Sequence, residues 1–251
     1  MRPPSLFLLT AVALYGQTQS LDDFLRVAQT KIEKKTDSSG KEYYSAKAEL
    51  FCSSSKAITA YVIAYATTYA DGTIKKGSLW ADLVPTLPIA GAKVVGPTKA
   101  HLGLLRKGDT DYFPISLTVP ASKAIPTVVQ AEVSAVVFDD CTTAGQDQKN
   151  VDWIFSYRQQ SLKVYQSQLT ALGDARRGAS EDKVIAHLRS KLSSEEQGLT
   201  KNNLLRQLDS AEKRVSLGQV SIRSWLDRYE KELTDYVNAF EKHQAKKGGQ
   251  Q

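Results

Sequence analysis

Two cysteines are the residues of this 251-residue chain whose type and placement most suggest chemistry. Cys52 ends the first strand-like segment and Cys141 ends the last. If the chain is exported, an even cysteine count favours a disulfide. Closing a loop of about 90 residues would stabilise the fold by about 4 kcal/mol in the chain-entropy treatment. The alternative is two separate thiols. Neither cysteine has a His or a second Cys nearby, so a catalytic or metal-binding thiol is not indicated.

Paired acids at the ends of predicted strands are the second candidates. Asp139 and Asp140 form the polar site that the sequence favours most, and Asp109 and Asp111 form a second pair. A calcium site needs 6–8 oxygen ligands, and no spaced Asp-x-Asp-x-Asp-Gly loop is present. Glycoside hydrolysis needs two carboxyl groups that face each other across a cleft. We therefore expect solvated turn acids, and keep a hydrolase or calcium-dependent enzyme using these acids as an alternative.

The remaining chemical motifs are weak. His101, His187 and His243 are isolated, which argues against zinc. The Ser53-x-x-Lys56 pattern lacks the companion boxes of penicillin-recognising enzymes, and no nucleophile elbow, phosphate loop or dinucleotide fingerprint occurs. The sequence therefore predicts no catalytic residue, no metal ligand and no cofactor, and enzyme activity is not indicated.

Three tryptophans fall in different predicted elements. Trp80, Trp153 and Trp225 could form a platform for a carbohydrate or a peptide. Tryptophans on apolar faces are more often part of a core. The sequence favours the core interpretation and leaves the platform as the alternative.

The N-terminus has the pattern of a secretory signal peptide. Arg2 precedes Ser5–Gly16, an apolar run too short for a membrane-spanning helix of about 20 residues. We expect residues 1–20 to be a signal peptide and the mature protein to be periplasmic or secreted, without a transmembrane span. An uncleaved anchor or a core helix is the alternative.

Beyond the signal, the elements that must position these residues fall into three blocks. Leu21–Lys35 has apolar residues at spacings of three and four, so residues 21–40 are predicted to be a short N-terminal helix. Residues 41–145 contain short strands with proline and glycine between them, including Ile58–Tyr69, the turn Asp71-Gly72 and Thr127–Phe138. This pattern predicts an antiparallel sandwich.

Residues 146–251 switch to helical periodicity and form the predicted helical domain, with a frayed C-terminus. The stripe that includes Trp225, Leu233 and Phe240 is the clearest. Such helices must bury their stripes, either in a helical bundle of helical hairpins or against another chain. Breakers such as Gly218 favour the bundle. The oligomeric state stays open.

Four stretches carry a family resemblance: SSSKAITAYVIAY, DYFPISLTV, VSAVVFDDCTTAG and WIFSYR. The segment Ser45–Arg158 resembles the immunoglobulin-like or fibronectin-type sandwiches of exported bacterial proteins. The resemblance implies an α+β protein with an immunoglobulin-like β-sandwich and an exported setting, and it assigns no activity and no functional residues. A glycine commonly stands in these proteins where Cys141 stands here, which makes a pairing of Cys141 with Cys52 attractive.

The charge of the chain limits its partners. The net charge is +6, and residues 151–251 hold 17 Lys and Arg against 13 Asp and Glu. No dense basic cluster suggests nucleic acid. We expect a non-catalytic binding, scaffolding or cell-envelope module whose partner is another protein or an envelope component. Electrostatic attachment of the basic helical tail to anionic envelope polymers is a further alternative.

Overall fold

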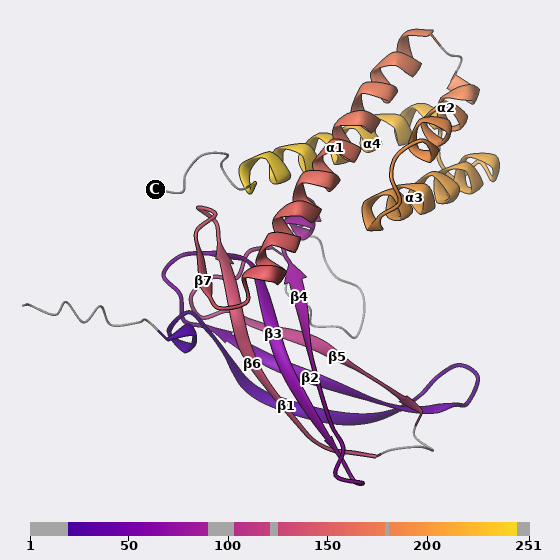
Figure 1. Cartoon of the computed structure of the whole chain (residues 1–251). Helices are drawn as coiled ribbons and strands as arrows, with labels where there is room; N and C mark the ends of the chain where they lie inside the picture. The colour runs from indigo at the N-terminus through magenta and orange to yellow at the C-terminus, as the bar shows by residue number, and fades with distance from the viewer. Residues whose placement is uncertain (1–19, 90–102, 121–124, 179–180, 245–251) are drawn as a thin grey trace, which may run out of the picture.

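The structure is a computed structural model that describes residues 20–89, 103–120, 125–178 and 181–244. It is an α+β fold in which two antiparallel sheets are followed by four helices that extend from one end of the sheets (Figure 1). The strands are β1 (Leu25–Thr36), β2 (Glu42–Cys52), β3 (Ile58–Tyr69), β4 (Ile74–Asp82), β5 (Thr110–Pro120), β6 (Pro126–Phe138) and β7 (Thr143–Gly145). The helices are α1 (Gln148–Gly178), α2 (Glu181–Ser193), α3 (Leu199–Ser216) and α4 (Ile222–Lys242), with short 3-10 helices η1 (Leu21–Asp23) and η2 (Val84–Ile89).

The predicted signal peptide, residues 1–20, lies outside the described residues except for Ser20. Within the described part of the chain, no helix combines the length and the apolar character needed to cross a membrane.

The sheets have the orders β1-β2-β5 and β4-β3-β6-β7. They pack face to face, because Leu50 of the first sheet and Tyr61 and Val136 of the second belong to one buried cluster. The strands predicted at Ile58–Tyr69 and Thr127–Phe138 are confirmed as β3 and β6. The turn Asp71-Gly72 joins β3 to β4, and Gly72 supplies the positive φ of +82° that it needs.

Strand β3 is buried on both faces, which explains its nearly continuous apolar sequence. Tyr61 and Ile63 face the core between the sheets. Ala60 and Val62 face the opposite way and pack against Ile154 at the start of α1. The first helix and the sandwich therefore share a small core.

The predicted N-terminal helix is wrong. Only η1 forms, with Ser20 and Asp23 in a capping box, and the chain then enters β1. The register of β1 shifts between Val27 and Gln29, which marks a bulge. A bulge inserts an extra residue into the period-two pattern, so Leu25 and Ile32 both pack inward while their spacing imitates a helix.

The four helices pack on one another, as the compact interpretation predicted. They share a buried cluster to which each contributes, including Leu172, Leu188, Leu208 and Leu233. Helix α1 continues through Gly173 and runs to Gly178. Helix α4 runs back toward the sandwich and packs on α1 and η2 (Figure 1).

A buried ion pair joins the helices to the sandwich. Arg158 of α1 is 0% exposed and donates to both carboxylate oxygens of Asp82 at the end of β4, at 2.9 and 2.8 Å. It also donates to the Thr59 hydroxyl and carbonyl on β3 and to the His243 carbonyl that follows α4. One side chain thus links two strands and two helices.

Candidate functional site

The structure does not gather the acids that the sequence singled out. Asp140 lies on the surface in the turn after β6, where Lys56 donates to it at 2.7 Å. The hydrogen bonds from Lys56 and Thr142 lower the pKa of Asp140 to about 2. Asp111 is buried at the start of β5 and accepts a 2.7 Å hydrogen bond from the Tyr61 hydroxyl. One carboxylate is inside the sandwich and the other outside it, so they do not face each other across a cleft.

The described residues also do not form a metal-binding cluster. Across residues 20–89, 103–120, 125–178 and 181–244, the structure assembles no group of three His, Cys, Asp or Glu side chains that could hold a metal ion. Asp139 uses its backbone N–H to bond the Ala57 carbonyl, which stabilises the turn.

The predicted disulfide between Cys52 and Cys141 is wrong. Cys52 is 0% exposed in the core between the sheets, and its burial raises the pKa of the thiol. The Cys141 thiol points elsewhere and donates to the Gln244 carbonyl at 3.0 Å. The two sulfur atoms therefore point toward different parts of the molecule.

The backbone at Cys141 explains the glycine expected there from the resemblance. Its φ is +67°, the left-handed region that costs an L-residue about 1–2 kcal/mol. Glycine adopts this φ without steric cost. The position is therefore set by turn geometry, and not by a partner for Cys52.

The structure instead brings two tryptophans together at the joint between the sandwich and α1. Trp80 of β4 and Trp153 of α1 have ring centroids 4.5 Å apart, and Tyr157 lies 5.7 Å from Trp80. The rings of Trp153 and Tyr157 are parallel, with an interplanar angle of 1° and centroids 5.9 Å apart. Trp225 is separate and buried in the helical core beside Tyr229.

Trp153 and Tyr157 form one wall of a cleft of about 510 Å³, which we call the aromatic cleft. This volume lies in the range of roughly 300–1,000 Å³ typical of small-molecule sites. Trp153 remains 47% exposed. The other lining residues are mostly polar: Ser156, Gln159, Gln160, Lys163, Val164, Glu195 and Glu196.

The aromatic wall is held by the sheet beneath it. The carboxylate of Asp147 accepts from the backbone N–H of Asn150, which caps the start of α1. The same carboxylate accepts from Ser134 of β6 at 3.3 Å. The Trp80 ring contacts the Trp153 ring, and Arg158, the residue after Tyr157, anchors α1 to Asp82. The rings therefore sit on a fixed stretch of helix.

The opposite wall is the turn between α2 and α3. Lys201 is 4% exposed and donates to the carbonyls of Ser193 and Glu195 at 3.0 and 2.7 Å, which holds the turn in place. The Glu195 carboxylate accepts from Ser167 of α1 at 2.6 Å. Both walls are therefore tied to α1, so the cleft is preformed.

Sequence reasoning missed this cleft because its parts come from distant segments. The spacing of Trp153 and Tyr157 by four residues was visible and places both rings on one helix face. The contact with Trp80 depends on how β4 packs on α1, and the position of Glu196 depends on the fold of the helices. Neither the Trp80 contact nor the position of Glu196 can be predicted from a local sequence pattern.

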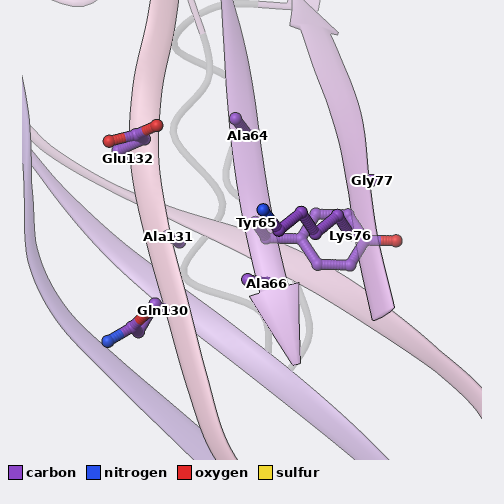
Figure 2. A pocket seen from close by; sticks show the side chains of 8 residues that line it. All are labelled: Ala64, Tyr65, Ala66, Lys76, Gly77, Gln130, Ala131 and Glu132. Atoms are coloured by element: carbon purple, nitrogen blue, oxygen red, sulfur yellow. The ribbon is translucent and has the colours of Figure 1, made fainter. Parts of the chain in front are cut away.

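A second hollow of about 390 Å³ lies over β3, β4 and β6 (Figure 2). Ala64 and Ala66 of β3 contribute to its floor, and Lys76 reaches across β3 from the neighbouring strand. The Tyr65 ring of β3 covers Gly77 of β4, where an added Cβ would lie 2.7 Å from the tyrosine oxygen. Its lining also includes Gln130 and Glu132 of β6.

Comparisons with known proteins identify no family for this chain. No protein-family model and no curated protein matches the chain. A solved structure of a hypothetical protein from Peptoclostridium difficile 630 is similar over 53% of this chain and 90% of its own, at 14% sequence identity and a TM-score of 0.30.

Proposed function

We propose that the protein is an exported, non-catalytic binding module of the cell envelope and that the aromatic cleft is its ligand-binding site. One observation carries the proposal. Trp153 keeps 47% of its surface exposed while it forms a parallel pair with Tyr157 on a preformed cleft. Large aromatic side chains supply much contact area at a low entropic cost, so an exposed pair above a cleft is suited to binding.

Binding fits the lining of the cleft better than catalysis does. None of the residues that line it is a histidine or a cysteine. The Ser156 hydroxyl donates to the backbone carbonyl of Asp152 at 2.8 Å and not to a base. Nucleophilic catalysis needs an activated nucleophile within reach of a base. The alternative enzyme using the loop acids is not favoured either, since Asp111 and Asp140 occupy separate environments.

We also propose that the sandwich is immunoglobulin-like, of the fibronectin type. The constant-type immunoglobulin arrangement pairs the first, second, fifth and fourth strands in one sheet. Here the first, second and fifth strands pair, while the fourth pairs with the third. The strand order supports an immunoglobulin-related sandwich in which the fourth strand belongs to the other sheet.

Electrostatic attachment through the helical tail is less favoured than the cleft. Arg176 pairs with Asp227 and Glu230, and Arg189 pairs with Asp209 and Glu212. Cations that are already paired with acids on the same surface attract an anionic polymer weakly.

Export and binding can be tested separately. A fusion of the first 30 or so residues to a phosphatase that is active only after export should give activity outside the cytoplasm. The full-length mature protein should sediment with isolated envelope material, and Trp153→Ala should reduce the sedimented fraction. Trp225→Phe, a change at a tryptophan outside the cleft, is the matched control. Wild-type protein that stays in the supernatant would refute the binding function, and an inactive fusion would refute export.

A further inference from the structure

We infer that the aromatic cleft binds a saccharide chain, an inference that rests on the proposed binding function. The cleft combines two parallel aromatic rings, Trp153 and Tyr157, with two glutamine amides, two carboxylates and an ammonium group. A sugar presents the complementary features, which are an apolar face of C–H bonds and a rim of hydroxyl groups.

The aromatic wall suits the C–H face of a sugar ring. A pyranose has a flat face of C–H bonds and a rim of hydroxyl groups. The face of an aromatic ring carries partial negative charge, so it attracts the partly positive C–H hydrogens. Trp153 and Tyr157 are stacked in parallel along one helix, with centroids 5.9 Å apart. The exposed part of this stacked pair provides the apolar surface for a sugar ring.

The polar groups of the cleft suit the hydroxyl rim. The Gln160 amide donates to the Glu196 carboxylate over 3.4 Å, which is a long and weak hydrogen bond. The amide oxygen of Gln160 and the second oxygen of Glu196 can accept hydroxyl hydrogens, and Lys163 can donate to hydroxyl oxygens. A carboxylate can accept from two neighbouring hydroxyl groups at once, so Glu196 is matched to a vicinal diol.

Other ligand classes fit the cleft less well. A wholly apolar ligand would cover Gln160, Glu196 and Lys163 without satisfying them, which is costly. A strongly charged ligand would meet both signs, since Lys163 lies in the same cleft as Glu195 and Glu196. A ligand rich in hydroxyl groups and low in charge can pack on the aromatic rings and also form hydrogen bonds with the polar groups of the cleft.

Calorimetric titration of the full-length mature protein with a panel of neutral tetrasaccharides tests the inference. The panel contains β-1,4-linked N-acetylglucosamine, β-1,4-linked glucose and α-1,4-linked glucose. We expect binding of at least one probe, with a shift of tryptophan fluorescence. Trp153→Ala should weaken that binding about tenfold or more, which corresponds to about 1.4 kcal/mol. Glu196→Gln should weaken it less than Trp153→Ala, because the amide retains one acceptor.

The controls separate this inference from the proposed function. Trp225→Phe should bind like the wild type, and thermal unfolding of each variant verifies that it folds. If Trp153→Ala does not fold, Trp153→Leu and Gln160→Ala replace it. The inference is overturned if no tetrasaccharide binds, or if the variants in the cleft bind as tightly as the wild type. If envelope sedimentation still depends on Trp153 while no sugar binds, the saccharide assignment fails and the binding function stands.

Discussion

Replacing Arg158 with methionine tests how the helices are attached to the sandwich. The side chains of Arg158 and Asp82 are 0% and 1% exposed, and their shortest contact is 2.8 Å. Removing one partner of a buried ion pair leaves the other charge without compensation, which costs about 3–5 kcal/mol. The carbonyls of Thr59 and His243 would lose a donor as well. The expected loss is a large part of a typical free energy of unfolding, about 5–15 kcal/mol.

Arg176→Met is the matched control. Arg176 also pairs with two acids, but its side chain is 34% exposed. A solvent-exposed ion pair contributes about 0–1 kcal/mol, so this variant should stay close to the wild type.

Urea unfolding, followed in parallel by circular dichroism and tryptophan fluorescence, measures both variants. A double variant, Arg158→Met with Asp82→Asn, should be more stable than the sum of the two single losses predicts, because the uncompensated charge is gone. If Arg158→Met costs no more than Arg176→Met, the ion pair does not anchor the helices and the reasoning is refuted.

Three further predictions concern the turn after β6 and the core. Cys141→Gly should be more stable than Cys141→Ala by about 1 kcal/mol in urea unfolding, because both lose the thiol but only glycine relieves the positive φ; equal stability would contradict this. Lys56→Met should raise the pKa of Asp140 from about 2 toward its ordinary value, as followed by NMR titration of the carboxyl group, whereas an unchanged pKa would show that Lys56 does not lower it. Burial and the nearby Asp111 raise the pKa of Tyr61 above its ordinary value. The folded state therefore keeps a proton that the unfolded chain releases at about pH 10, so stability should fall as pH rises above about 10. Absorbance at alkaline pH should show that Tyr61 ionises only when the protein unfolds. Tyr61→Phe, which lacks the hydroxyl, identifies the signal of Tyr61.

The sequence by itself determined the elements whose local residue pattern is unambiguous. Ile58–Tyr69 was readable as a strand because β-branched and aromatic residues crowd it, and the stripe through Trp225 and Phe240 was readable as a helix because its spacing follows 3.6 residues per turn. The α+β class and the order of sheets before helices follow from these local patterns. The strand β1 was misread as a helix because a bulge between Val27 and Gln29 breaks its alternation.

Only the tertiary structure decided which chemical groups meet. Cys52 ends β2 and Cys141 lies in the turn after β6, and their thiols point into the sandwich core and toward the C-terminal end of α4. Trp80 and Trp153 are far apart in sequence, yet the packing of α1 on β4 places their rings 4.5 Å apart. Side-chain direction and helix packing arise from contacts summed over the whole fold, which no short segment encodes. The candidate site is therefore a property of the joint between the sandwich and its helices.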